Sequence, residues 1–243
     1  RQKLFEKQQK ILVETEKEKM RSNLLRAVSH DLRTPLTCIL FSATTHLENE
    51  NTITKEESKK LLQDIMQDAQ WLIHMVENLL AITRINNEKA VIKKQPEAVE
   101  EVVAQTIAKM KKRFSNCQIH ASVPDEFIMI PMDATLIIQV LVNLLENAIR
   151  HSHSTEPISL TVIYTEQEAV FSIKDKGIGL KPEELPHIFE GVSIEKTGDS
   201  TRGLGIGLSI CKAIISAHKG TISAENNIDG GATFRFSLPK ERS

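Results

Sequence analysis

His30 and Asp31 are neighbours in the stretch VSHDLRTPLTC, at residues 28–38, and together they could carry chemistry. A carboxylate that accepts a hydrogen bond from the Nδ1–H of an imidazole fixes the tautomer of the ring. The Nε2 lone pair is then left to act as a nucleophile. Because neighbouring side chains on a helix point about 100° apart, we expect a slightly distorted helix to bring this carboxylate to the ring. The pair therefore predicts a nucleophilic His30 that Asp31 activates.

Pro35 lies one turn further along a stretch that otherwise reads as one long helix. A proline inside a helix removes a backbone N–H and clashes with the carbonyl four residues earlier, here that of residue 31. We expect a bend that exposes His30 and makes two arrangements accessible, as a switch requires. The alternative is a solvated histidine beside an ordinary kink, and a single histidine on a helix would favour it.

A second candidate site begins with the stretch DKGIGL, at residues 175–180. Gly177 and Gly179 have no side chains, which would let the backbone come close to a flat ligand. Asp175 could accept a hydrogen bond from an amino group such as that of adenine. Glycine turns after strands occur in proteins of many kinds, so this stretch alone favours a structural turn.

The stretch GLGIGLSI, at residues 203–210, opens a predicted helix. Gly203, Gly205 and Gly207 lie at its start, where free backbone N–H groups could bind phosphate oxygens. The stretch differs from a dinucleotide-binding fingerprint because no strand leads directly into it. A glycine-rich hinge is the alternative.

The stretch NLLENAIRH, at residues 143–151, places polar residues three and four positions apart along one helical face. These residues are Asn143, Glu146, Asn147 and Arg150, and Leu141, Leu144, Leu145 and Ala148 would face the core. Asn147 could give a neutral oxygen to Mg²⁺, a hard cation that is commonly shared with phosphates, and Arg150 could meet phosphate charge. A solvent-facing polar stripe would have the same sequence.

The elements that hold His30 are expected to be helical. Before residue 90 the chain has no glycine and one proline. Residues 3 to about 48 predict one helix, and a second, opened by a capping box of Thr54 and Glu57, runs to about Ile85. The second helix has an apolar seam of Leu62, Ile65, Ala69, Leu72, Val76 and Leu79. Because a lone hairpin cannot bury two apolar stripes, we expect a homodimer that forms a four-helix bundle.

The elements that hold the second candidate site mix helices and strands. Helices are expected over residues 97–113 and 133–151, which start near the helix-start signals Pro96 and Asp133, and over residues 204–218, ending at Gly220. The expected strands are QIHASV, EFIMI, PISLTVIYT, AVFSIKD, GTISAEN and ATFRFSL. This order predicts an α+β two-layer sandwich. The long polar segment from Lys181 to Arg202 predicts a lid.

Composition argues against several classes of protein. The formal net charge of −1 gives no broad positive field for nucleic acid or anionic lipid. The three cysteines lie far apart without ligand spacing, which argues against a disulfide framework or a zinc site. No apolar run reaches the ~18 residues that a membrane span needs. The charged start without Met is expected for a piece of a longer chain.

The string SHDLRTPLT, from Ser29 to Thr37, resembles the phosphoacceptor box of bacterial sensor histidine kinases without a gap. The resemblance implies that His30 is the phosphorylated residue and that Asp31 activates it. It further implies that Thr34 orients a hydrolytic water when such a kinase acts as a phosphatase. Arg33 would either steady phosphate charge or remain a solvated surface residue.

Residues 93–240 resemble the ATP-binding domain that histidine kinases share with DNA gyrase, Hsp90 and MutL. The three glycine- and asparagine-containing stretches occur in the family's order, and Thr233 in GGATFRF matches a threonine near the nucleotide. The resemblance implies ATP and Mg²⁺ as ligands, with Asn147 on the metal. The residues expected at the nucleotide are Asn143, Asn147, Arg150, His151, Asp175, Gly177, Gly179, Lys196, Arg202, Gly203, Gly205, Gly207 and Thr233.

The expected lid departs from the family pattern. The family has an arginine shortly after a phenylalanine there, whereas this chain has IFEGVSIEKTGD with no arginine. Lys196 or Arg202 would have to meet the phosphates in its place. His151 occupies a position where the family commonly has tyrosine or phenylalanine.

Together the resemblances imply a helical-hairpin dimerisation domain followed by an α+β sandwich of the ATP-binding type. We expect a helical connector at 1–22, a dimerisation and phosphotransfer domain at 23–90 and the ATP-binding domain at 91–243. The wording SNLLRAVSHDLRTPLT is most similar to kinases of the potassium-responsive Kdp type. The chain would be the cytoplasmic part of a bacterial membrane-bound sensor, itself without contact to membrane or nucleic acid.

The implied activity is ATP-dependent phosphorylation of His30, followed by transfer to an aspartate of a response regulator, with phosphatase activity toward that regulator. Two rival functions are a conformational ATPase clamp and a non-catalytic dimerisation scaffold. The acceptor string argues against the clamp. Intact Asn147, Asp175 and glycines 203–207 argue against the scaffold, although the unusual lid keeps it open.

Overall fold

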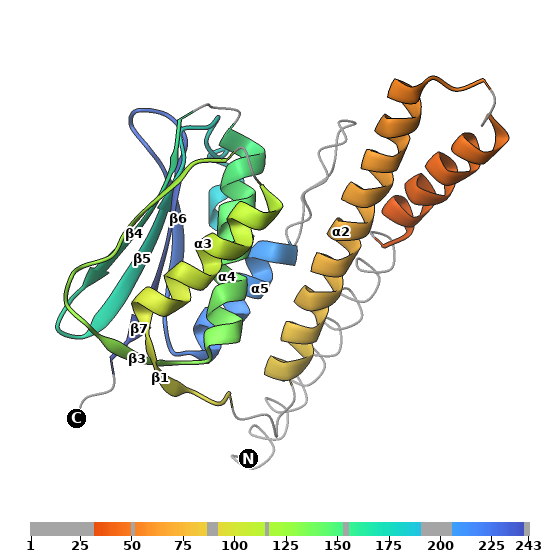
Figure 1. Ribbon diagram of the computed structural model, residues 1–243. Helices are drawn as coiled ribbons and strands as arrows, with labels where there is room; N and C mark the ends of the chain where they lie inside the picture. Colours follow the sequence, from red (N-terminus) through yellow and green to blue (C-terminus); the bar gives the residue numbers. More distant parts are fainter. Residues whose placement is uncertain are drawn as a thin grey trace, which may run out of the picture. The chain divides into compact units, whose positions relative to one another are not determined.

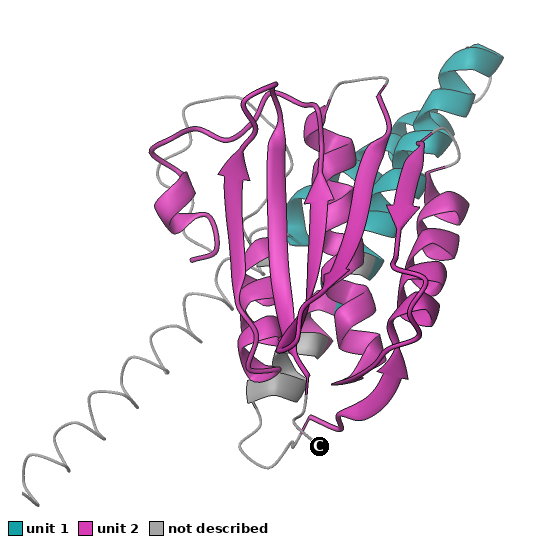
Figure 2. Cartoon of the chain, turned by 90° about the vertical axis from the view of Figure 1, so that its left-hand side faces the viewer, with its two compact units in different colours: residues 1–77 teal, residues 78–243 magenta. Residues whose placement is uncertain are grey.

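The computed structural model describes residues 32–49, 52–86, 92–114, 117–152, 156–190 and 206–240 (Figure 1). The chain divides into two compact units, residues 1–77 and residues 78–243 (Figure 2). His30, Asp31, Lys196, Arg202, Gly203 and Gly205 lie outside the described residues.

Two helices joined by a short turn make up the described part of the first unit. Residues 32–48 are helical, and α2 spans Lys55–Asn86. The backbone N–H of Thr54 donates to Glu57 Oε2 at 2.9 Å, and the Glu57 N–H donates to Thr54 Oγ1 at 3.2 Å. This reciprocal pair satisfies two donors at the start of α2, and it confirms the capping box predicted from the sequence.

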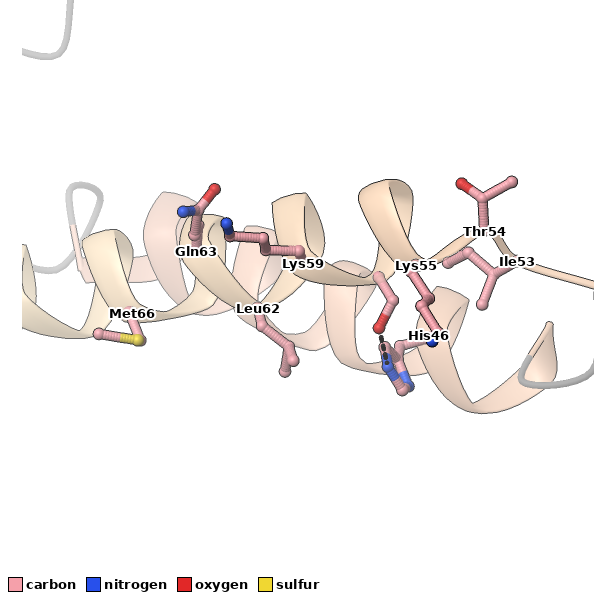
Figure 3. A pocket seen from close by; sticks show the side chains of 9 residues that line it. His46, Ile53, Thr54, Lys55, Lys59, Leu62, Gln63 and Met66 are labelled. Atoms are coloured by element: carbon pink, nitrogen blue, oxygen red, sulfur yellow. Dashed lines mark hydrogen bonds between the residues drawn. The ribbon is translucent and has the colours of Figure 1, made fainter.

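A pocket lies between the two helices at the turn end of the hairpin (Figure 3). His46 Nε2 and Ser58 Oγ are 2.8 Å apart and join the helices there. Further along α2, Leu62 and Met66 line the pocket, and their exposed fractions are 50% and 61%. The hairpin therefore does not close its own apolar groove.

Large apolar side chains remain exposed along both helices in the single chain. Their exposed fractions run from 49% to 73%, and they are Leu36, Leu40, Phe41, Leu47, Leu62, Met66, Ile73, Val76 and Leu80. Of the predicted seam, Ile65, Ala69, Leu72 and Leu79 are half-buried, while Leu62 and Val76 are exposed. Burying such surface stabilises a protein by about 25 cal/mol per Å². The hairpin thus has a strong physical reason to associate.

The second unit is built on a five-stranded sheet in the order β2-β4-β5-β7-β6. Its strands are β2 (Ile119–Ser122), β4 (Ile158–Tyr164), β5 (Glu168–Lys174), β7 (Ala232–Pro239) and β6 (Ile222–Asn226). Strand β2 runs parallel to β4, and the other neighbours are antiparallel. A separate antiparallel pair is formed by β1 (Gln95–Ala98) and β3 (Met129–Met132).

Three helices cover one face of this sheet: α3 (Val99–Arg113), α4 (Ala134–Ser152) and α5 (Ile206–Ala217) (Figures 1 and 2). The inward positions of β5 are Ala169, Phe171 and Ile173, all fully buried. Phe171 stacks on Phe236 of β7 with ring centroids 4.6 Å apart. In α4, Leu141, Leu144, Leu145 and Ala148 are buried as predicted. The α+β two-layer sandwich is confirmed.

Two local predictions were wrong. The strand expected over EFIMI begins only at Met129, and Phe127 is exposed. Its partner β1 was not predicted, because Pro96 is a helix-start signal in the sequence. In the structure Pro96 lies opposite Pro131 in a separate two-stranded ribbon. Proline cannot donate to a ladder, so it suits such an edge position and masks the strand pattern.

The end of α5 also differs from the prediction. Lys219, not Gly220, is the left-handed residue, with φ of 63°. Its N–H donates to Ser216 O at 2.9 Å, and the Gly220 N–H donates to Ile215 O at 2.9 Å, which is a Schellman ending. Gly220 is required for another reason, because a Cβ there would lie 1.9 Å from Ser237 O in β7.

Candidate functional site

The described part of the acceptor string is helical from residue 32. Thr34 is exposed and Pro35 is buried. Thr37 Oγ1 donates to Arg33 O at 2.8 Å, a side-chain bond back to the preceding turn that tends to bend a helix. The bend at Pro35 and the geometry of the His30–Asp31 pair fall on residues outside the described part of the chain, so both stay predictions.

Asp175 lies just after β5 and is only 5% exposed. Its Oδ1 accepts from the Gly177 N–H at 2.8 Å and from the Ala232 N–H at 3.3 Å, while its own N–H donates to Ala232 O at 3.0 Å. Within the described residues Oδ2 accepts no hydrogen bond. One carboxylate oxygen is therefore fixed by the protein and the other is left for a ligand.

The glycines around Asp175 allow three backbone segments to meet. A Cβ on Gly177 would lie 2.4 Å from His151 O and 2.6 Å from Ser152 Cα, at the end of α4. Gly179 has φ of 75°, which L side chains rarely adopt. Gly231 has φ of 82°, and a Cβ there would lie 2.1 Å from Asp175 O. Side chains at these positions would separate α4, the 175–180 loop and the turn before β7.

The polar face of α4 is buried at two of its four predicted positions, Asn143 and Glu146. Asn143 is 7% exposed and Glu146 is 4% exposed, so the alternative of a solvent-facing stripe does not apply to these two residues. Asn143 Nδ2 donates to Gly207 O in the first turn of α5 at 3.5 Å. Glu146 forms an ion pair with Arg113 at the end of α3. Buried polar groups of this kind need partners, and these partners tie α4 to both neighbouring helices.

The remaining predicted residues of α4 are more open. Asn147 and His151 are half-buried, and Arg150 is exposed. Asn143, Asn147 and Arg150 thus run from the buried to the open end of one helical face. In α5, burial raises the pKa of the Cys211 thiol to about 12, so Cys211 is an uncharged packing residue.

Two residues of this site were not predicted from the sequence, Asn226 and Asn227. Asn226 exchanges two hydrogen bonds with the backbone of Leu180, each 2.7 Å long. Asn227 Nδ2 donates to Asp175 O at 3.0 Å, and its Oδ1 accepts from Thr233 Oγ1 at 2.6 Å. The only available signal in the sequence was a pair of asparagines before Asp-Gly-Gly, which predicts a turn but not its contacts.

The same turn is also charged at its rim. Asp229 pairs with Lys176 at 2.6 Å and with Lys174 at 3.3 Å. The hydrogen bond from Lys176 lowers the pKa of Asp229 to about 2, and the bond with Asp229 raises the pKa of Lys176. Since Asp229 is exposed and both lysines are partly open to solvent, such pairs contribute little to stability.

Buried His218 fixes the start of α4. Its Nε2 accepts from the Asp133 N–H at 3.0 Å, and Nδ1 lies 2.8 Å from Ile214 O, to which it donates. These partners require the neutral ring, and burial lowers its pKa. Asp133 Oδ1 in turn accepts from the Leu136 N–H at 3.2 Å, which confirms the predicted helix-start signal.

The first ten residues of the expected lid, 181–190, are described. They contain a short 3-10 helix at Leu185–His187. Phe189 packs edge-on against Phe234 of β7, with centroids 6.4 Å apart. His187, the last residue of this short helix, is exposed, and its Nδ1 lies 2.8 Å from Glu190 Oε2.

Comparison with known families accounts for both units. Residues 20–88 match the family described as "His Kinase A (phospho-acceptor) domain". Residues 132–242 match the family described as "Histidine kinase-, DNA gyrase B-, and HSP90-like ATPase". The chain belongs to the sensor histidine kinases. The histidine kinase core includes the acceptor string and all three nucleotide stretches.

Relatives of this histidine kinase core include two sensor proteins named KdpD. That of Clostridium acetobutylicum is 44% identical over 98% of this chain and 27% of its own length. That of Escherichia coli K12 is 33% identical over 93% of this chain and 25% of its own length. The chain thus spans about a quarter of the length of these relatives. The Kdp-type resemblance is confirmed.

Among solved structures, histidine kinase ThkA in complex with response regulator protein TrrA matches with a TM-score of 0.66 and 23% identity. The match covers 90% of this chain and 61% of that chain. At this identity it supports the fold alone. In the described part of the histidine kinase core, no helix is long and apolar enough to cross a membrane.

Proposed function

We propose that this chain is an ATP-dependent protein-histidine kinase that phosphorylates its own His30 and passes the phosphoryl group to an aspartate of a response regulator. The observation that carries the proposal is the fixed Asp175 carboxylate, with one oxygen bonded to backbone amides and the other without a partner in the described residues. A polar acceptor of this kind selects a ligand with a hydrogen-bond donor, such as the amino group of adenine.

The residues around Asp175 fit a nucleotide. The glycines leave no Cβ atoms where α4, the 175–180 loop and the turn before β7 meet. The start of α5 offers backbone N–H groups for phosphate oxygens. We assign the nucleotide to Asp175, Thr233, Asn143, Asn147, Arg150, His151 and the glycines 177, 179, 203, 205 and 207, with Lys196 or Arg202 meeting phosphate charge from the lid segment.

Mg²⁺ fits the donor set only as an ion shared with phosphates. Among the described residues, no group of three His, Cys, Asp or Glu side chains could hold a metal. Asn147 would supply one amide oxygen, and bound Mg²⁺ would neutralise charge on the phosphates.

His30 is the proposed nucleophile. Its Nε2 lone pair forms the bond to the γ-phosphorus, while the bond between that phosphorus and the bridging oxygen breaks and ADP leaves with the electron pair. Asp31 holds the Nδ1 proton and stabilises the charge that develops on the ring. Phosphoryl transfer asks mainly for positioning and charge stabilisation from a protein. The resulting phosphohistidine is labile enough to pass its phosphoryl group to a carboxylate.

Phosphatase activity toward the regulator is a further part of the proposal. Thr34 is exposed on the helix and lies four positions after His30 in the sequence, and its hydroxyl group could hold a water against a partner's phosphoaspartate. The string from Ser29 to Thr37 supports this role through its likeness to the family's acceptor box.

We further propose that the hairpin dimerises into a four-helix bundle. The exposed apolar side chains on residues 32–48 and on α2 support this assembly, because water-exposed stripes of this size on a hairpin favour a second copy. A response regulator is the proposed partner of the bundle. The rest of a longer protein, bound to the membrane, would supply the stimulus.

Calorimetric titration with ATP, with and without Mg²⁺, separates the kinase from a scaffold. A kinase binds ATP and binds it more tightly with Mg²⁺, whereas a scaffold gives no heat in either titration. A conformational clamp would bind ATP and release phosphate without retaining any on the protein.

A further inference from the structure

We propose that Asn227 is a positioning residue that sets the direction of the Asp175 carboxylate, and thereby the preference for a purine with an exocyclic amino group. The inference rests on the proposed nucleotide site and names the residue that makes the site selective. Asn227 follows the last residue of β6 and is half-buried at the start of the turn that leads into β7.

Asn227 makes three side-chain hydrogen bonds with the surrounding turn. Its Nδ2 donates to Asp175 O at 3.0 Å and to Gly230 O at 3.3 Å. Its Oδ1 accepts from Thr233 Oγ1 at 2.6 Å. Two carbonyl oxygens need a donor and the hydroxyl group has a proton to give, so these partners fix which amide atom points which way.

The bond to Asp175 O is the one that reaches the ligand-binding group. Within the described residues, Asn227 Nδ2 is the sole side-chain or backbone donor to this carbonyl. The Gly231 backbone lies close to the same oxygen, since a Cβ on residue 231 would be 2.1 Å from it. Without Asn227, the carbonyl would lack a hydrogen bond in a crowded place, which favours rotation of the Asp175 peptide toward water.

Rotation of this peptide about the Cα–C bond of Asp175 would move the residues that follow it, and with them the Gly177 N–H that holds the carboxylate through Oδ1. Asp175 Oδ1 is bonded to the N–H of Ala232 and of Gly177, and those bonds hold only in the present orientation. Thr233, one residue after Ala232, is bonded to Asn227 in turn. The Asn227 side chain therefore holds both the Asp175 backbone and the strand residues that bind Oδ1, and so keeps Oδ2 directed toward the proposed ligand.

Two neighbouring residues of the same turn, Asn226 and Asp229, contact other groups than Asp175, so Asp229 can serve as a control position. Asn226 holds Leu180, at the far end of the 175–180 loop. Among the described residues, Asp229 forms ion pairs with two lysines, Lys174 and Lys176, near the surface of the turn. Asp229→Asn removes those exposed pairs from the same turn without touching Asp175, so it should leave nucleotide selectivity unchanged.

The test compares ATP with purine riboside triphosphate, which lacks the amino group, in calorimetric titrations of the whole chain. Asn227→Asp keeps the size and the acceptor but loses both N–H donors, and Asn227→Ala loses them without adding charge. We expect ATP affinity to fall about tenfold in both variants, the typical effect of one lost hydrogen bond to a buried group. The analogue should bind nearly as in the wild type, and Asp229→Asn should preserve the preference for ATP.

A ratio of the two affinities cancels general weakening of the fold or of the phosphate contacts. Equal losses for both nucleotides in Asn227→Ala, or an unchanged ratio, would overturn the positioning role. Asp175→Asn separates this failure from failure of the proposed nucleotide site. If Asp175→Asn abolishes the preference for ATP and Asn227→Ala does not, only the Asn227 inference fails. If Asp175→Asn leaves the preference intact, the site assignment fails and the inference falls with it.

Discussion

Gly231 lies against Asp175 so closely that a Cβ on residue 231 would be 2.1 Å from the Asp175 carbonyl oxygen. The turn before β7 thus forms one wall of the site around the buried carboxylate. Only a glycine combines this contact with the φ of 82° that residue 231 adopts. The position of the Asp175 carboxylate consequently depends on a residue 56 positions later in the chain.

We predict that Gly231→Ala weakens ATP binding at least about tenfold and lowers the free energy of unfolding by about 1–3 kcal/mol, since clash and positive φ add. Gly230→Ala is the matched control, because Gly230 has φ of 91° but its Cβ would meet no atom closer than 3.9 Å. Urea unfolding and ATP titration of both variants measure the effects. Equal ATP affinities in the two variants would contradict the role of the contact.

The Arg113–Glu146 ion pair should be costly to break from one side. Arg113→Met leaves a carboxylate that is 4% exposed without this cation, which we expect to destabilise the domain by about 3 kcal/mol. Adding Glu146→Gln to this variant removes the buried charge and should restore most of the loss. The free energy of unfolding in urea is measured for Arg113→Met, Glu146→Gln and the double variant. If the two single losses add up to the loss in the double variant, the pair is not coupled.

His218 should make stability depend on pH. Burial lowers its pKa from the ordinary value of 6.5, so the unfolded chain binds a proton more readily than the folded one. Stability is then fully present above pH 6.5 and is lost as the pH falls below it, toward the folded pKa. Unfolding free energies measured between about pH 8 and 5 should therefore decrease, and more steeply than in His218→Gln. Parallel curves for the two proteins would show that another group is responsible.

The exposed apolar face of the hairpin should hold two copies together. We expect Phe41→Glu and Met66→Glu, at positions 69% and 61% exposed in the single chain, to halve the mass measured by light scattering. Gln63→Glu adds the same charge to an exposed polar position of α2 and should preserve the dimer. A wild-type chain with the mass of a monomer would rule out the proposed bundle.

Features set by neighbouring residues were predictable from the sequence. The Thr54–Glu57 capping box depends on residues three positions apart, and the inward face of α4 follows from its apolar spacing. Strand β1 was missed because its pairing with β3 involves residues more than 30 positions away and its proline hid the pattern. The ending of α5 at Lys219 was missed because Gly220 is required by β7, which no local rule reveals.

In the candidate site, too, features set by nearby residues were predictable and features set by distant residues were not. Asp175 and its glycines stand out through spacing, whereas the burial of Asn143 and Glu146 depends on partners in α5 and α3. Asn226 and Asn227 read as ordinary turn residues because their contacts with Leu180 and Asp175 join segments about 50 positions apart. Long-range hydrogen bonds have no sequence signal comparable to helical or strand periodicity.

Phosphate retention on His30 tests the central claim most directly. The purified chain is incubated with γ-labelled ATP and Mg²⁺, and the label that stays on the protein is followed in acid and in alkali, with His30→Gln and His46→Gln as matched variants. The account predicts label that is lost in acid and stable in alkali in the wild type and in His46→Gln, and none in His30→Gln although it still binds ATP. Undiminished label on His30→Gln, or no label on a wild-type chain that binds ATP, would contradict it.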